Sequence, residues 1–177
     1  MTVRIALPQD AAAIAQVHIA AWQVAYRGLL PDSLLDNLSL SQRTLEWQEI
    51  LASNSGQTLV YTQARETYVE IVGFATIGQC RDADLAQERV GEVYALYLRP
   101  ACWGKGYGAT LFAAAVERLQ AQGYPLITLW VLDGNQRAMR FYQAAGFHAD
   151  GRTQEETLPG GSNVREVRYR CMLTIAV

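Results

Sequence analysis

The chain has 177 residues, of which 50% are hydrophobic and 18% are charged, and its formal net charge is −2. This length predicts one domain over residues 1–177 with a sizeable core, and the small net charge gives no electrostatic reason to expect a nucleic-acid partner. The three cysteines are far apart and form no CxxC pair, which argues against a disulfide framework and a zinc site. No signal-like N-terminal run and no apolar stretch of about 18 residues is present. We therefore expect a cytoplasmic protein that uses no metal and has no nucleic-acid or membrane partner.

The first third of the chain is predicted to form a short strand and three helical segments. Residues 2–7 are typical of a strand, and residues 10–26 carry apolar side chains at helical spacing. Gly28 ends this helix, and Pro31 begins a short helical piece. A capping-box pattern then predicts a helix over residues 39–51.

Strand-forming residue types dominate from Gln57 onward. Residues 58–64 and 68–78 predict two strands around a charged turn. The predicted elements that follow are a strand at 92–98, a helix at 109–122, a strand at 126–131, a helix at 135–145, and closing strands at 147–153 and 166–175. This order predicts an α/β (α+β) fold with a mixed, mostly antiparallel sheet of about seven strands and helices on both faces.

A glycine-rich loop joins the strand at 92–98 to the helix at 109–122. Gly104, Gly106 and Gly108 alternate within it. Such a loop can aim several backbone N–H groups at one point, and the helix N-terminus adds partial positive charge there. The loop therefore predicts a site for a phosphate or pyrophosphate.

The loop alone leaves the ligand open. Gly104, Gly106 and Ala109 satisfy the dinucleotide pattern G-x-G-x-x-G/A, with Asp133 after the next strand. The loop lies past mid-chain, however, and too few residues follow it to build a second mononucleotide-binding half. A nucleotide-triphosphate loop is excluded because Lys105 is followed by glycine rather than by Ser or Thr.

A second motif narrows the choice of ligand for the glycine-rich loop. The segment from Asn135 to Tyr142 reads NQRAMRFY and is followed by Ala145, Gly146 and Phe147. It resembles the block N-x-x-A-x-x-F-Y-x-x-x-G-F of the GNAT superfamily of N-acetyltransferases, and the glycine loop resembles the family's [QR]-x-x-G-x-[GA] motif. The likeness covers nearly the whole chain. It departs from the family at Trp103, where the motif most often has Gln or Arg.

This resemblance implies transfer of an acetyl group from acetyl-CoA to a primary amine of a small molecule, a protein N-terminus or a lysine, by direct attack in a ternary complex. It also implies main-chain contacts to the cosubstrate from a strand that separates from its neighbour, often at a bulge. The residues expected to bind acetyl-CoA are Leu96, Tyr97, Leu98, Trp103, Gly104, Lys105, Gly106, Tyr107, Gly108, Ala109 and Asn135.

Two residues are predicted to perform the proton transfers. Tyr142 matches the tyrosine that the family commonly uses as a general acid, and a phenol can protonate a departing thiolate. Glu92, on the strand before the loop, matches a glutamate that faces the acceptor in many relatives, and we predict it as the base. The structural alternatives are a packed tyrosine and a solvated strand-end charge. Asn135 is also suited to cap the following helix.

The sequence leaves open the alternative function, the acceptor and the oligomeric state. A non-catalytic acyl-CoA sensor on the same fold is the alternative function. Residues 22–51 and 154–163 are expected to shape the acceptor site without identifying the acceptor. Trp22, Tyr26 and Trp47 could line the acceptor pocket, but aromatic residues at helical spacing are mostly core residues. A homodimer is possible because many relatives pair.

Overall fold

A computed structural model of the protein describes residues 2–53, 55–158, 161 and 163–173. Its centre is a seven-stranded sheet in the order β1-β2-β3-β4-β5-β7-β6, in which only β4 and β5 are parallel neighbours. The strands are β1 (Thr2–Ile5), β2 (Gln57–Ala64), β3 (Val69–Gln79), β4 (Val90–Leu98), β5 (Leu126–Leu132), β6 (His148–Thr157) and β7 (Asn163–Met172). The helices are α1 (Ala11–Ala25), α2 (Asp32–Asp36), α3 (Leu40–Ala52), α4 (Tyr107–Ala121) and α5 (Gln136–Ala144), with 3₁₀ turns η1 (Pro8–Asp10), η2 (Ala83–Leu85) and η3 (Pro100–Cys102). Within the described ranges, none of these helices is both long and apolar enough to cross a membrane.

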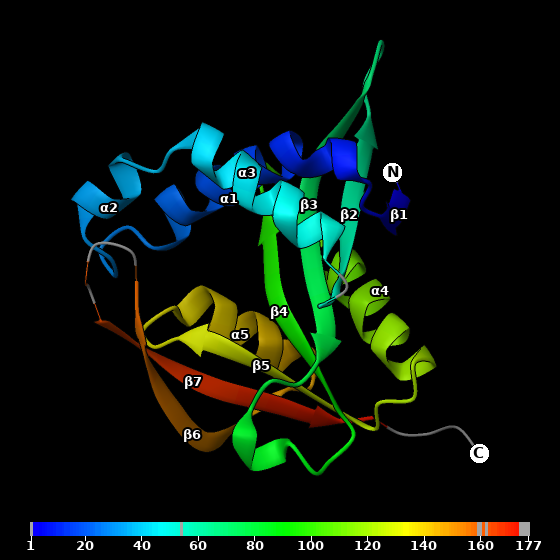
Figure 1. Cartoon of the computed structure of the whole chain (residues 1–177), viewed down its shortest axis with the longest axis vertical. Helices are drawn as coiled ribbons and strands as arrows, with labels where there is room; N and C mark the ends of the chain where they lie inside the picture. The colour runs from blue at the N-terminus through cyan, green and yellow to red at the C-terminus, as the bar shows by residue number, and fades with distance from the viewer. Residues whose placement is uncertain (1, 54, 159–160, 162, 174–177) are drawn as a thin grey trace.

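Helices cover both faces of the sheet, which confirms the predicted architecture (Figure 1). On one face, α1 and α3 bury Ile14 together with Val60 and Phe74 of the sheet. On the other face, α4 buries Leu111 against Val72 and its neighbours. Alternate residues of β2 and β3 therefore enter different cores, which explains why both strands are apolar along most of their length.

The sheet divides between β4 and β5, and this opening positions the site. The two strands pair over only four residues, Val90–Val93 against Leu126–Leu129. Figure 1 shows β5 diverging from β4 beyond that point. On its other side, β4 shifts register with β3 at Tyr94, the extra residue of a β-bulge. The separation and the bulge agree with what the family resemblance implied for the strand that holds residues 96–98.

Several observed boundaries differ from the predicted ones, and three of them affect the site. α4 begins at Tyr107 rather than at residue 109, because Gly106 adopts a left-handed conformation and forms the N-cap. β6 continues to Thr157, and β7 begins at Asn163, because exposed polar residues pair across this hairpin. Their polarity hid the longer strands from pattern analysis. The predicted strand end at 174–175 lies outside the described residues, as do positions 159–160 and 162 of the predicted loop.

A buried arginine ties the segment before β4 to the last hairpin. Arg168 on β7 is 3% exposed. Its guanidinium donates to Asp150 on β6 and to Asp82 and Asp84 at η2, with distances between 2.8 and 3.0 Å. Three elements that are distant in sequence therefore meet at one cation.

Candidate active site

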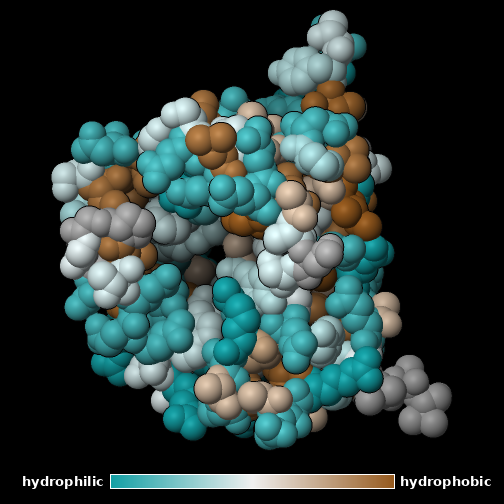
Figure 2. All heavy atoms as spheres, viewed as in Figure 1, coloured by the Kyte–Doolittle hydropathy of each residue, from teal (hydrophilic) through white to brown (hydrophobic). Residues whose placement is uncertain are grey.

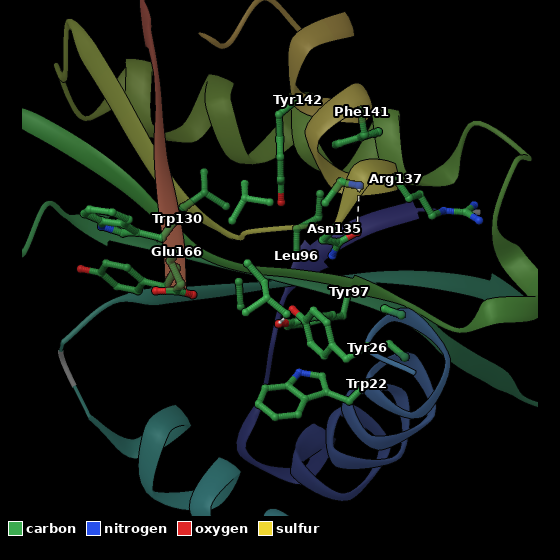
Figure 3. A pocket seen from close by; sticks show the side chains of 18 of the residues that line it. Trp22, Tyr26, Leu96, Tyr97, Trp130, Asn135, Arg137, Phe141, Tyr142 and Glu166 are labelled. Atoms are coloured by element: carbon green, nitrogen blue, oxygen red, sulfur yellow. Dashed lines mark hydrogen bonds between the residues drawn. The ribbon is translucent and has the colours of Figure 1, made fainter. Parts of the chain in front are cut away.

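The opening between β4 and β5 contains a cavity of about 1190 Å³. Figure 2 shows the molecule hollowed near its middle, and Figure 3 shows side chains arranged around this space. Its walls come from α1, β4, the loop before α4, β5, α5 and the β6–β7 hairpin. The predicted site residues that line it are Glu92, Leu96, Tyr97, Leu98, Trp103, Gly104, Gly106, Gly108, Ala109, Asn135 and Tyr142. The side chains of Lys105 and Tyr107 are not part of the lining, and Tyr107 stacks on Tyr61 instead.

The loop before α4 has the geometry of an anion site. Gly104 and Gly106 have φ angles of +74° and +80°, and a Cβ built on either would meet nothing within 4 Å. The first four N–H groups of the helix, those of Gly106–Ala109, have no acceptor within the helix, and no described residue accepts from them. Four free donors, the helix dipole and open space therefore coincide at this point.

Trp103 anchors this loop through its indole and does not supply the polar side chain that Gln or Arg would place there. Its indole N–H donates to the Leu98 carbonyl at 2.9 Å, which fixes the loop to the end of β4. The Arg137 guanidinium of α5 lies 4.2 Å from the centre of the same ring and lines the cavity. Arg137 thus places a cation near the free amides. It was not predicted as a site residue, because contact between α5 and the loop is not visible in sequence.

Asn135 caps α5 and also borders the cavity. Its Oδ1 accepts from the Ala138 N–H at 3.1 Å (Figure 3), so the capping interpretation is confirmed. The side-chain N–H₂ group makes no hydrogen bond to another described residue. It is available to a ligand that lies between α5 and β4.

Tyr142 extends from α5 into the cavity, as Figure 3 shows. Its ring is 8% exposed and packs against Phe112 and Phe141. Burial raises the pKa of the Tyr142 phenol above its ordinary value, and the nearby Tyr97 hydroxyl adds to the effect. The phenol is therefore protonated at neutral pH, which is the state that a proton donor needs.

Glu92 is buried in an ion pair. Its side chain is 2% exposed, and Oε1 accepts from Nη2 of Arg81 at 2.7 Å. Oε2 accepts from the main-chain N–H of Arg81 at 3.0 Å. Tyr94, which also lines the cavity from β4, donates its hydroxyl to the Gln79 carbonyl at 2.6 Å. Both side chains thus already have partners at the wall of the cavity.

Aromatic rings from α1 and β4 form the wall opposite α5. The hydroxyls of Tyr26 and Tyr97 lie 2.8 Å apart, and the ring of Trp22 packs edge-on against Tyr26. Trp22 and Tyr26 pack against a core cluster and also line the cavity, so both interpretations of these two rings apply. Trp47 is 3% exposed and belongs to the core. The helical spacing of the first two rings gave no signal that the strand beside them separates from the sheet.

The β6–β7 hairpin contributes three carboxylates to the lining of the cavity. Glu155 and Glu156 lie in the segment 154–163 that was expected to shape the acceptor site, whereas Glu166 lies outside it and was missed. Glu166 is half-buried on β7 and pairs with Gln154 of β6. The alternation of residue types along β7 indicates which side chains share a face of the strand with Glu166. It does not show that this face borders a cavity.

His18 stands behind these rings as a neutral side chain. The Trp47 indole N–H donates to His18 Nδ1 at 3.2 Å, which assigns the imidazole proton to Nε2. The imidazole stacks on the Tyr97 ring at 5.2 Å between centroids. Burial, reinforced by the charge of Arg43, lowers the pKa of His18 to about 3.

This depressed pKa predicts how stability depends on pH. Between about pH 6.5, the ordinary histidine value, and about pH 3, the unfolded chain binds one more proton at this position than the folded chain. The contribution of neutral His18 is complete above this range and is lost as pH falls, by about 1.4 kcal/mol per pH unit. In urea unfolding at about pH 4 to 6, His18→Gln should reduce the slope of the unfolding free energy against pH by this amount. Equal slopes for His18→Gln and wild type would contradict the assignment.

One group of potential metal ligands borders the cavity. Atoms of Cys80, Asp82 and Glu92 lie within 4.8 Å of one another. The two carboxylates already serve Arg168 and Arg81, and the Cys80 sulfur accepts from the Thr128 hydroxyl. These groups act as an ion-pair and hydrogen-bond network.

Comparison with known proteins defines the family. A profile of the acetyltransferase (GNAT) family matches residues 21–147. YuaI of Bacillus subtilis (strain 168), an uncharacterised N-acetyltransferase, is 30% identical over 144 residues, which cover 81% of this chain and 78% of YuaI. The chain therefore belongs to the GNAT family of acetyltransferases.

Solved structures have the same fold. One is yncA from Salmonella typhimurium with its cofactor acetyl-CoA, with a TM-score of 0.67 and 19% identity, covering 100% of this chain and 96% of yncA. Another is the PaiA N-acetyltransferase from Thermoplasma acidophilum in complex with coenzyme A, with a TM-score of 0.69 and 18% identity, covering 98% of this chain and 100% of PaiA. The seven-stranded, mostly antiparallel architecture is thus that of GNAT acetyltransferases.

Proposed function

We propose that the protein transfers the acetyl group of acetyl-CoA to a primary amine, by direct attack in a ternary complex. The acceptor is a small molecule, a protein N-terminus or a lysine. One observation carries the proposal: the free amides at the start of α4 and the Tyr142 hydroxyl open into the same cavity. The similar folds that hold acetyl-CoA and coenzyme A support this choice of cosubstrate.

The residues present fit acetyl-CoA. Its pyrophosphate carries negative charge and suits the amides of Gly106–Ala109, with Arg137 as a nearby cation. The left-handed glycines leave room for close approach of the phosphates. The Asn135 amide and the edge of residues 96–98 that no longer pairs with β5 would hold the pantetheine arm and direct the thioester toward Tyr142.

The chemistry requires proton transfers at two atoms. An alkylamine has a pKa near 10.4 and is protonated at neutral pH, so a base must accept its proton before attack. Main-chain N–H groups of β4 would stabilise the negative charge that develops on the carbonyl oxygen. Tyr142 would then protonate the departing thiolate. The assignment of Glu92 as the base stays a prediction, and Arg81 occupies its carboxylate in this structure.

The direct test is thiol release from acetyl-CoA in the presence of spermidine, cadaverine, tyramine or a lysine-containing peptide. We expect release that depends on an amine, with an equal amount of acetylated product by mass spectrometry. Tight binding of coenzyme A without amine-dependent release would favour the acyl-CoA sensor instead.

The role of the loop before α4 in coenzyme A binding can be tested separately from acetyl transfer. Gly106→Val should weaken coenzyme A binding by more than about tenfold, because a β-branched residue is strained at this φ and its side chain enters the open space. Gly151→Val is the matched control, since Gly151 has φ +87° with nothing within 4 Å and does not line the cavity. Isothermal titration calorimetry with coenzyme A should show near-normal affinity for this control. Normal affinity in Gly106→Val would exclude the loop as the pyrophosphate site.

A further inference from the structure

Glu166 has one carboxylate oxygen that is open to the cavity. Its Oε2 accepts from Nε2 of Gln154 at 2.7 Å. No hydrogen bond or ion pair from another described residue engages Oε1. Figure 3 shows the side chain projecting from β7 into the cavity, near Trp130 of β5.

The other carboxylates that line the cavity differ from Glu166 in one of two ways. Those of Glu92 and Asp82 have both oxygens engaged, by Arg81 in the first case and by Arg168 and the Trp130 indole in the second. Those of Glu155 and Glu156 are exposed to solvent. Among the described residues, Glu166 alone combines partial burial with a free oxygen inside the cavity.

The surroundings of Glu166 favour a proton acceptor. Burial raises its pKa above the ordinary value, and the carboxylates of Glu156 on β6 and Glu92 on β4 act in the same direction. The Gln154 amide and the Arg81 guanidinium oppose this shift without cancelling it. A carboxylate accepts protons more readily as its pKa approaches the working pH.

The same surroundings favour a positively charged guest. The carboxylates of Glu156 and Glu92 act electrostatically on Glu166, and among the described residues only Glu92 of these three forms an ion pair. The rings of Trp22, Tyr26 and Trp130 line the adjoining wall (Figure 3). Ammonium groups bind beside carboxylates, and aromatic faces attract cations.

We propose that Glu166 binds the ammonium group of a cationic alkylamine acceptor and accepts the proton that its nitrogen loses before attack. This assignment rests on the acetyl transfer proposed above. The freed lone pair forms the nitrogen–carbon bond, and the carbon–sulfur bond breaks with its electron pair on sulfur. Tyr142 supplies the proton of the new thiol and is reprotonated by the second proton that leaves nitrogen. The first proton passes from Glu166 to solvent, so one proton is released in each turnover.

The test compares Glu166→Gln with wild type on acetyl-CoA and the best amine of the panel above. Glutamine keeps the size of the side chain and an oxygen for the Gln154 amide. We expect kcat/KM at pH 7 to fall by about 100-fold, while the thermal shift with coenzyme A stays as in wild type. The midpoint of the acidic limb in the profile of kcat/KM against pH should move upward, toward the pKa of the free amine, because without this base only the unprotonated amine reacts. The deficit should shrink with aniline, an aromatic amine that is unprotonated at neutral pH and needs no base before attack.

Two matched variants separate this role from a general loss of charge. Glu117→Gln removes an exposed carboxylate of α4 outside the cavity and should keep the wild-type midpoint of the acidic limb. Glu92→Gln tests the alternative base, and a midpoint that moves toward the amine pKa in this variant but not in Glu166→Gln would assign the role to Glu92. An unmoved midpoint in Glu166→Gln, or an equal deficit with aniline and the alkylamine, would overturn the assignment. If wild type releases no thiol with any amine, the transferase proposal fails first, whereas activity in wild type matched by Glu166→Gln refutes Glu166 alone.

Discussion

Replacing Tyr142 by phenylalanine is expected to lower kcat by about 100-fold or more, because a positioned general acid typically contributes 10²–10⁴-fold. The phenol extends from α5 into the cavity, and burial keeps it protonated at neutral pH. The ring would remain packed on Phe112 and Phe141. Coenzyme A affinity should therefore stay near the wild-type value. Steady-state kinetics of thiol release, together with calorimetric titration of coenzyme A, measure both quantities.

Tyr169→Phe is the matched control for this substitution. Tyr169 is also a buried tyrosine of the same core, 4% exposed, but it does not line the cavity. Its loss of a hydroxyl should leave kcat within a few-fold of wild type. Unchanged turnover in Tyr142→Phe would remove this residue from the chemistry and leave it a packing role.

Replacing Arg168 by methionine is expected to lower the free energy of unfolding by about 3–5 kcal/mol, the usual cost of breaking a buried charge pair from one side. The substitution leaves Asp150, with a side chain 4% exposed, and Asp82, at 12%, without their cation. Methionine fills a similar volume, so the loss comes from the uncompensated carboxylates rather than from a cavity. Urea denaturation at pH 7 measures the effect.

Two further variants test whether unpaired carboxylates cause the loss of stability in Arg168→Met. Arg170→Met removes an exposed arginine from the same strand and should change the free energy of unfolding by less than about 0.5 kcal/mol. Adding Asp150→Asn to Arg168→Met should recover part of the lost stability, because it removes one stranded charge. No recovery in this double variant would show that packing, rather than charge, explains the loss.

The parts of the site that sequence analysis predicted are those with local signals. Alternating glycines between a strand and a helix need no tertiary information to indicate an anion loop, and the block that ends in Tyr142 identified α5. The order of elements likewise predicted the mixed sheet. Asn135 combined two local roles, and its capping role appeared as expected.

The parts of the site that sequence analysis did not predict depend on contacts between segments that are distant in sequence. Glu166 enters the cavity only because the β6–β7 hairpin has its particular register and lies against β5. Arg81 meets Glu92 because the segment after β3 folds back on β4. Because β4 separates from β5, Trp22 and Tyr26 border a cavity as well as pack against the core. Periodicity describes one element at a time and does not specify which of its faces will border an opening.

The central claim is that the α4 amides hold the pyrophosphate of a thioester cosubstrate whose sulfur lies beside Tyr142. A crystal structure of the protein with coenzyme A tests it most directly. We expect phosphate oxygens within hydrogen-bond distance of the N–H groups of Gly106–Ala109, and the coenzyme sulfur within reach of the Tyr142 hydroxyl. Coenzyme A bound away from this loop, or a Tyr142 hydroxyl directed away from the sulfur, would contradict it.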